Sequence, residues 1–182
     1  MTQNAHHNLI EHYEGVLPDN ACDLLIRAFE GAGELVHRNL GPQNFYEYNL
    51  NQDNPQAAQA LCQFTLLARQ KYQTSHPLES RFWPSKVALE EMRVKRYTGG
   101  TEQQFSDHVD VGDCSSAKRY LAFLFYLNDD FEGGQTIFYP GTVIEPKKGS
   151  VVVFPPTWAY PHAGVPVLKG TKYIMSSYLN YL

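Results

Sequence analysis

Three side chains able to bind a metal ion, His108, Asp110 and His162, lie in the second half of the sequence. His108 and Asp110 are two positions apart, and alternate side chains of a strand share a face, so one ion can contact both. His162 supplies a second imidazole, and Lys172 follows it by ten positions. Two imidazoles, one carboxylate and a nearby cation suggest an iron site that activates oxygen. Because a histidine and an aspartate also occur at this spacing by chance, the interpretation depends on the surrounding sequence.

The composition is that of a sheet-rich globular protein. The 182 residues are 43% apolar and include 12 tyrosines and 10 phenylalanines, so we expect one domain over residues 1–182. A net charge of −4 gives no broad basic surface, which argues against a nucleic-acid partner. The three cysteines contain no CxxC pair, so we expect free thiols in a reducing compartment and no structural zinc.

Targeting and membrane signals are missing from the sequence. Residues 1–7 do not combine a basic start with an apolar run. No later segment approaches the roughly 20 apolar residues of a membrane span. We therefore expect a cytoplasmic protein with no membrane partner.

Residues 1–84 predict two helices that support the rest of the chain. One starts at Asp19 or Asn20, and a second starts at Asn54-Pro55, where a capping side chain precedes a proline. Their apolar faces must pack on another element, most simply the outside of a sheet. Between the helices, residues 38–53 are compatible with an edge strand plus a mobile lid loop, or with a plain surface connection.

From residue 85 onward the pattern changes to the two-residue alternation of strands. A long strand from Val87 to Tyr97 is interrupted at Glu90-Glu91. The segment 120–127 is apolar on both faces, so one face lines an interior while the other supports a helix. Many short strands separated by turns predict a sandwich or barrel. Besides that long strand, strands are expected at 104–110, 118–127, 135–139, 142–145, 150–154, 158–167 and 171–181.

One ordered set of motifs runs through residues 94–182. It comprises Arg96-Tyr97, Gly99-Gly100, Phe105, His108-Val109-Asp110, Tyr126-Leu127-Asn128, Gly133-Gly134-Gln135-Thr136-Ile137-Phe138, Pro146-Lys147-Lys148-Gly149, Phe154, His162 and Gly170-Thr171-Lys172-Tyr173. In this order the motifs resemble the catalytic domain of the iron(II)/2-oxoglutarate-dependent oxygenases, in the prolyl 4-hydroxylase-like branch. The resemblance implies a mainly β protein. Its core is a double-stranded β-helix, or jelly-roll, over residues 85–182, with N-terminal helices packed on the sheet.

The resemblance also assigns roles to the metal-binding side chains. His108, Asp110 and His162 become the catalytic iron ligands, and they leave three positions open for a bidentate 2-oxo acid and dioxygen. Lys172 becomes the partner of the distal carboxylate of 2-oxoglutarate. Ten extended residues span about 33 Å, so the chain must reverse between His162 and Lys172 for this to happen. An ammonium buried there needs such an anion, whereas outside this context an exposed strand lysine is the simpler interpretation.

Further ligands of the cosubstrate are implied by the same resemblance. Tyr126 is expected to hydrogen-bond the distal carboxylate, Tyr97 to stand near the metal-proximal end, and Thr136 to line the pocket. Each has an ordinary alternative as a packed aromatic ring or a strand threonine. Arg119 is expected to form a structural salt bridge, with Asp110 or a substrate as its other possible partners.

The activity implied is that of an iron(II)- and 2-oxoglutarate-dependent dioxygenase. It hydroxylates an unactivated C–H bond, most simply of a prolyl residue in a peptide or protein, and releases succinate and CO2. The expected cofactors and cosubstrates are Fe(2+), 2-oxoglutarate and O2, with ascorbate as reductant. A small molecule or a free amino acid is the alternative substrate. Nucleic-acid dealkylation is disfavoured because Tyr178 stands where that branch carries a second arginine. A non-catalytic, metal-binding jelly-roll module is the alternative from another class.

Overall fold

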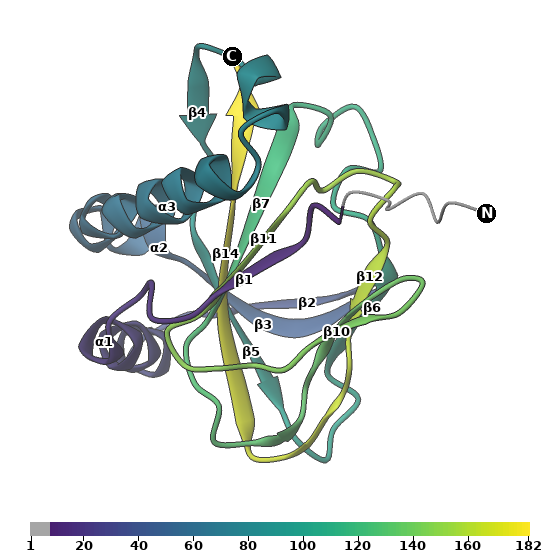
Figure 1. Cartoon of the computed structure of the whole chain (residues 1–182). Helices are drawn as coiled ribbons and strands as arrows, with labels where there is room; N and C mark the ends of the chain where they lie inside the picture. Colours follow the sequence, from purple (N-terminus) through teal and green to yellow (C-terminus); the bar gives the residue numbers. More distant parts are fainter. Residues whose placement is uncertain (1–7) are drawn as a thin grey trace.

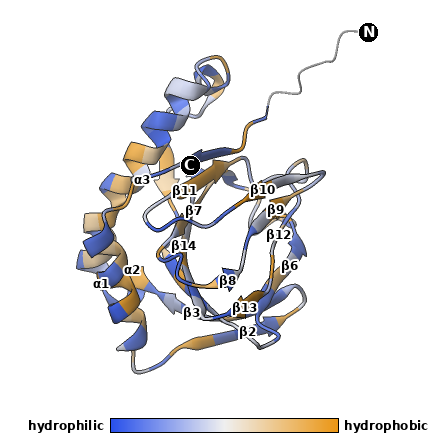
Figure 2. Cartoon of the chain, turned by 60° about the horizontal axis from the view of Figure 1, so that its bottom comes forward, coloured by the Kyte–Doolittle hydropathy of each residue, from blue (hydrophilic) through white to orange (hydrophobic). Residues whose placement is uncertain are grey.

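The computed structural model describes residues 8–182, so the stretch 1–7, on which the expectation of no leader rests, lies outside the described residues. Its main feature is a 12-stranded antiparallel sheet whose strands are arranged in a ring, with the helices along one outer side (Figures 1 and 2). This confirms the predicted mainly β fold with a double-stranded β-helix core and supporting helices. None of the helices in 8–182 is long and apolar enough to cross a membrane.

The strands of the main sheet follow the order β1-β11-β7-β14-β5-β3-β6-β12-β9-β10, with β2 added to β3 and β4 to β14. β8 and β13 form a separate pair. The helices are α1 (Asp19–Glu30), α2 (Leu50–Asp53) and α3 (Pro55–Ser75), followed by the 3-10 helix η1 (Glu79–Phe82). The strands are β1 (Glu11–Tyr13), β2 (Val36–Leu40), β3 (Gln43–Asn49), β4 (Val87–Leu89), β5 (Arg93–Thr98), β6 (Gln104–His108), β7 (Arg119–Tyr126), β8 (Glu132–Gly133), β9 (Thr136–Phe138), β10 (Thr142–Ile144), β11 (Val151–Phe154), β12 (His162–Gly164), β13 (Val167–Lys169) and β14 (Thr171–Tyr181).

The two long helices begin where the sequence predicts. The side chain of Asn54 accepts a hydrogen bond from the backbone N–H of Ala57, and Pro55 occupies the first turn of α3, where its missing N–H costs nothing. α1 starts at Asp19, next to Pro18. Both helices bury one apolar stripe against the outer face of β5, β14, β7 and β11. The buried residues of these helices are Cys22, Leu25, Phe29, Ala58, Leu61, Thr65, Ala68 and Tyr72.

Strand β7 separates two apolar clusters, as its two-faced sequence predicts. Leu121, Phe123 and Phe125 pack with the helices, while Ala122 and Tyr126 belong to a second cluster inside the ring of strands. Alternate side chains of a strand point to opposite faces, so a strand between two apolar layers must be apolar throughout. The inner cluster surrounds the site described below.

The structure corrects two expectations about local structure. Residues 38–53 form no long loop: β2 and β3 make a hairpin that turns at Gly41, whose φ is +59°, and α2 follows. β3 pairs with β5 and β6 inside the main sheet, so three strands of the N-terminal segment belong to that sheet. The strand expected at 158–167 is reduced to β12 and the start of β13. A turn closed by the Tyr160 N–H to the Thr157 carbonyl replaces its first part, next to Pro161, which lacks an N–H for pairing.

Candidate metal centre and adjoining pocket

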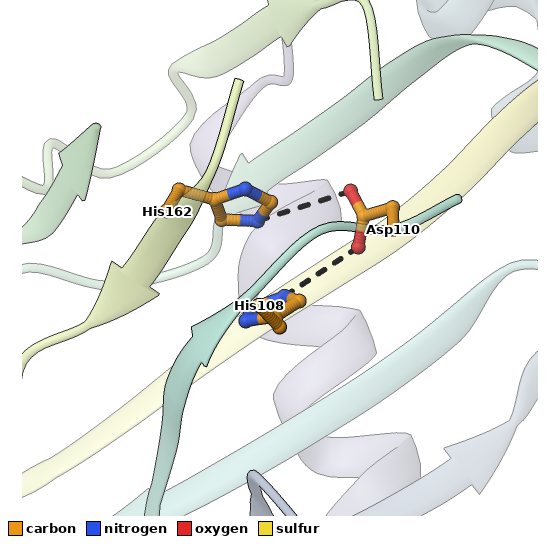
Figure 3. A group of neighbouring side chains, drawn as sticks. All are labelled: His108, Asp110 and His162. Carbon is orange, nitrogen blue, oxygen red and sulfur yellow. Dashed lines mark ion pairs between the residues drawn. The ribbon is translucent and has the colours of Figure 1, made fainter. Parts of the chain in front are cut away.

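Two paired strands bring the predicted metal ligands together. β12 lies antiparallel to β6, and His162 is directly opposite His108 in the register. Asp110 follows two residues after His108, just past the end of β6. Figure 3 shows the three side chains pointing toward one another. Nε2 of His108 lies 3.5 Å from Oδ1 of Asp110, and Nε2 of His162 lies 3.8 Å from Oδ2. One ligand atom from each residue lies within 4.8 Å of the others, close enough for one ion.

Both imidazoles are oriented by backbone carbonyl groups. Nδ1 of His108 lies 2.7 Å from the carbonyl oxygen of Ser106, and Nδ1 of His162 lies 3.1 Å from that of Tyr160. A carbonyl can only accept, so each Nδ1 carries the hydrogen and each Nε2 keeps its lone pair for a metal. Burial lowers the pKa of His162, which favours the neutral imidazole that a metal requires.

The side chain of Asp110 is buried, and hydrogen bonds hold both its carboxylate and its backbone carbonyl. Burial raises its pKa, but the contact with His108 and the other neighbouring groups outweigh this and bring the pKa to about 2. The hydroxyl of Tyr178 donates a hydrogen bond to Oδ1 over 3.0 Å. Arg119 donates from Nη1 to the backbone carbonyl of Asp110 over 2.9 Å, and its Nε and Nη2 bind both carboxylate oxygens of Glu90 at 2.8 and 2.5 Å. Arg119 therefore forms the expected structural salt bridge and also fixes the Asp110 backbone.

These residues fit an iron(II) ion. They bring two imidazole nitrogens and one carboxylate oxygen together, which is the ligand set of the 2-His-1-carboxylate facial triad. The hydrogen bonds at Nδ1 and at the carboxylate supply the outer contacts that such ligands usually have.

A pocket adjoins these ligands and contains Lys172 on its wall. We call it the inner pocket; its lining includes His108, Asp110, His162, Tyr97, Thr136 and Lys172. Lys172 lies on β14 opposite Tyr97 on β5 and is only 4% exposed. The chain reverses between β12 and β14, with Gly170 at a φ of +85°. Nζ of Lys172 donates to the carbonyl of Gly134 over 2.5 Å, and burial lowers its pKa to about 7. A carboxylate beside this ammonium would stabilise its charge.

Comparison with known families decides the identity of this arrangement. A family model described as the 2OG-Fe(II) oxygenase superfamily matches residues 92–180, a range that contains the three candidate metal ligands and Lys172. The chain belongs to the 2OG-Fe(II) oxygenase superfamily. Within this superfamily it falls in the prolyl 4-hydroxylase-like branch, as the motif order predicts.

Individual members of the superfamily show how far the similarity extends. The chain is 32% identical to prolyl 4-hydroxylase subunit alpha-1 of Gallus gallus over an alignment 108 residues long, which covers 50% of this chain and 20% of that protein. It thus spans about a fifth of the length of such relatives. The 2OG complex of the viral collagen prolyl hydroxylase from Paramecium Bursaria Chlorella virus-1 is 25% identical, with a TM-score of 0.72 over 97% of both chains. A Trichoplax adhaerens prolyl hydroxylase, solved with a hypoxia inducible factor peptide fragment, shares the fold at 14% identity, with a TM-score of 0.74 over 96% of this chain and 84% of that one.

The remaining predicted residues of this oxygenase lie around Lys172. Nζ of Lys172 is 5.8 Å from the ring centre of Tyr97 and 5.3 Å from that of Tyr126, so two aromatic faces flank the ammonium. Thr136 lines the inner pocket, whereas Tyr126 is not among the lining residues. The Tyr126 hydroxyl instead donates to Oγ1 of Thr136 over 2.6 Å. Burial raises the pKa of both tyrosines, so their hydroxyls stay protonated.

Two residues at the site were not assigned to it from sequence. Tyr178 touches Asp110, and Lys95 lines the inner pocket. The alternation of β14 carries a usable signal, because Lys172, Ile174, Ser176 and Tyr178 are spaced by two and all line the pocket. Lys95 is two positions before Tyr97 on β5 and is found by the same argument.

Proposed function

We propose that the chain is an iron(II)- and 2-oxoglutarate-dependent dioxygenase that hydroxylates an unactivated C–H bond and releases succinate and CO2. One observation carries the proposal: two imidazoles and a carboxylate converge beside a pocket whose wall holds a buried, anion-free lysine. The cofactors and cosubstrates are Fe(2+), 2-oxoglutarate and O2, with ascorbate as reductant.

His108, Asp110 and His162 hold the iron through the two Nε2 atoms and the carboxylate. Iron supplies the activation of dioxygen when bound. The protein contributes by keeping these side chains in place: carbonyl groups fix both rings, and Tyr178 and Arg119 fix the carboxylate. The apolar inner cluster excludes water from the reacting groups.

The inner pocket receives 2-oxoglutarate. Lys172 binds the distal carboxylate, which replaces the Gly134 carbonyl as the principal partner of the ammonium. Tyr97 lines the inner pocket, and we assign its hydroxyl to the metal-proximal end of the bound acid. Thr136 accepts a hydrogen bond from Tyr126, so its own hydroxyl hydrogen is free to be donated into the pocket. Tyr126 thereby acts through Thr136.

The substrate proposed is a prolyl residue of a peptide or protein. Support comes from the prolyl 4-hydroxylase relatives and from the Trichoplax enzyme of the same fold that was solved with a peptide fragment. A small molecule or free amino acid carrying a comparable ring is the alternative. Partners of other kinds, nucleic acid, membrane or structural zinc, form no part of the proposal, and a cytoplasmic location is proposed on the sequence alone.

The test is an assay of succinate formed from 2-oxoglutarate with Fe(II) and ascorbate, with and without a panel of proline-containing peptides. His108→Ala and Asp110→Ala each remove an iron ligand and should abolish succinate formation. His37→Ala is the matched control, because His37 is an exposed histidine on β2 whose ring forms a hydrogen bond with Asn44 and stacks on Tyr46. Unchanged turnover in His108→Ala or Asp110→Ala contradicts the proposal. Fe(II) binding, measured anaerobically by calorimetry, should be lost in the same two variants and kept in the control.

A further inference from the structure

A second buried lysine, Lys95, lies at the same site. It is 7% exposed and occupies the middle of β5, opposite Glu47 on β3 and opposite Ile174 on β14. Lys95 and Tyr97 alternate on this strand and share the inward face, and both line the inner pocket. Tyr97 is opposite Lys172, and Lys95 precedes Tyr97 by two residues on β5. The ammonium groups of Lys95 and Lys172 therefore lie on one wall of the inner pocket.

Lys95 also lines a second hollow, the outer pocket, which Lys172 does not reach. The outer pocket shares His108, Asp110 and Tyr178 with the inner one and adds side chains of the β2–β3 hairpin and of Arg93 and Arg119. Lys95 therefore lies at the boundary between the inner pocket, which receives the cosubstrate, and the outer pocket. A second ligand that reaches the metal from the outer pocket passes this ammonium.

The arginines around the outer pocket already have carboxylate partners. Arg38 binds Glu47 at 2.9 Å, Arg93 binds Glu91 at 2.8 Å, and Arg119 is paired with Glu90. Glu47, the cross-strand neighbour of Lys95, is shared between Arg38 and Arg93, the latter at 3.6 Å. These contacts largely neutralise one another, and within residues 8–182 none of these carboxylates forms an ion pair with Lys95.

The ring faces of two aromatic residues flank the ammonium of Lys95, and the carboxylates of Glu47 and Asp110 attract its charge without forming an ion pair with it. Its Nζ is 5.1 Å from the ring centre of Phe45 and 5.5 Å from that of Phe105. Within residues 8–182, no hydrogen bond or ion pair of this ammonium is formed. Burying a cation that contacts no anion directly costs free energy of folding, and the two aromatic ring faces offset only part of that cost. A site that keeps such a group is prepared for a negatively charged ligand.

None of the ligands already assigned to the site supplies an anion for Lys95. Asp110 is needed by the metal, and the two carboxylates of 2-oxoglutarate are used by the metal and by Lys172. We propose that Lys95 binds a carboxylate of the substrate, carried close to the carbon that is hydroxylated. This inference rests on the proposed function and narrows its substrate class to prolyl compounds with an adjacent acid. The carboxylate comes either from a C-terminal or free prolyl residue or from an acidic side chain next to an internal prolyl residue.

Two matched pairs of compounds test the assignment and separate its two sources. The first pair is N-acetyl-alanyl-proline as the free acid and as the amide; the second is N-acetyl-alanyl-prolyl-glutamate α-amide, whose side-chain carboxylate is free, and N-acetyl-alanyl-prolyl-glutamine amide, which differ only in the charge of the last side chain. For at least one pair, wild-type kcat/KM for hydroxylated product should be roughly 10- to 100-fold higher with the carboxylate than with its neutral partner. Anaerobic calorimetry with the protein loaded with Fe(II) and 2-oxoglutarate should show the same preference in binding.

Lys95→Met keeps the length of the side chain and removes its charge, so the preference should fall to within about twofold, while Lys95→Arg should retain part of it. Lys169→Met is the control, because Lys169 is a lysine of β13 whose side chain is 80% exposed. Equal wild-type values for both members of both pairs overturn the assignment without any variant. A rise in KM for 2-oxoglutarate alone in Lys95→Met assigns the ammonium to the cosubstrate and overturns it too. Failure of the wild type to form succinate, with the binding preference intact, contradicts the proposed function but supports the role of Lys95.

Discussion

The hydroxyl of Tyr178 lies 3.0 Å from Oδ1 of Asp110. The guanidinium of Arg119 lies over the ring of the same tyrosine, with Cζ 4.0 Å from the ring centre. Arg119 in turn donates to the backbone carbonyl of Asp110. One tyrosine and one arginine therefore hold the side chain and the main chain of the candidate carboxylate ligand. The orientation of Asp110 is fixed before a metal arrives, which reduces the entropy lost on binding.

Tyr178→Phe should weaken Fe(II) binding about tenfold, because outer-shell partners of metal ligands typically contribute 10- to 100-fold in affinity. Burial raises the pKa of Tyr178 well above its ordinary value, so the hydroxyl donates throughout the physiological range. Anaerobic calorimetry of Fe(II) binding measures the effect. Tyr181→Phe is the control, since Tyr181 is on the same strand, is 48% exposed, and packs its ring against Tyr120. Equal Fe(II) affinities of Tyr178→Phe and wild type rule out the positioning role.

Local patterns made much of the fold and two of the three candidate metal ligands predictable. The spacing of His108 and Asp110 needs only an extended chain to place both side chains on one face. The two-sided apolar run of β7 required a layer on each side, and Asn54-Pro55 marked the start of α3. Each of these rests on residues close in sequence.

Register between distant strands was out of reach of such patterns. His162 reaches His108 because β12 pairs with β6 at one register, and a shift by one residue would turn the imidazole away from the site. The same limit applies to Lys95, which forms no ion pair within residues 8–182 because two arginines of β2 and β5 bind Glu47. Only the motif order of the family, and not spacing, joined His162 and Lys172 to the first two ligands.

The charge of Lys172 should make stability depend on pH. Its pKa falls from 10.5 to about 7 on burial, so between these values the unfolded chain holds a proton that the folded chain has released. The free energy of unfolding of the ligand-free protein therefore rises with pH in this window, by at most about 1.4 kcal/mol per pH unit from this group. Below pH 7 the full cost of the buried charge is present.

Lys172→Met removes that cost. The variant should be more stable than the wild type at pH 6.5, and the difference should shrink at pH 7.5 and again at pH 8.5 in urea unfolding. Lys169→Met, an exposed lysine change, should show no such trend. A stability difference for Lys172→Met that stays constant with pH contradicts the predicted pKa shift. The same variant should lose binding of 2-oxoglutarate. Burying the charge of Lys172 would then lower stability while enabling the cosubstrate to bind.

Gly149 joins the start of α1 to the sheet and cannot carry a side chain. Its φ is +76°, and a Cβ there would collide with the carbonyl oxygen of Leu17. Its own carbonyl accepts hydrogen bonds from the N–H groups of Val16 and Leu17 at 3.0 and 2.9 Å. Gly149→Ala should destabilise the protein by about 2–4 kcal/mol, from the left-handed backbone and the overpacking together. In urea unfolding, Gly141→Ala should be close to neutral, because its added Cβ meets nothing within 4 Å. Comparable losses in both variants would contradict this explanation.

The hydrogen bond between Tyr126 and Thr136 can be isolated by a double-mutant cycle. Thr136→Val keeps the shape of the side chain but leaves the fully buried Tyr126 hydroxyl without its partner, which should cost about 1–3 kcal/mol in the ligand-free protein. Tyr126→Phe should cost less, because Thr136 lines a pocket that water can enter. Adding Tyr126→Phe to Thr136→Val should recover part of the loss, since no orphaned hydroxyl then remains. Urea unfolding of the four proteins gives the coupling energy. Additive losses would mean that the two hydroxyl groups are not paired, and Tyr126 would then be free to turn toward a ligand of Lys172.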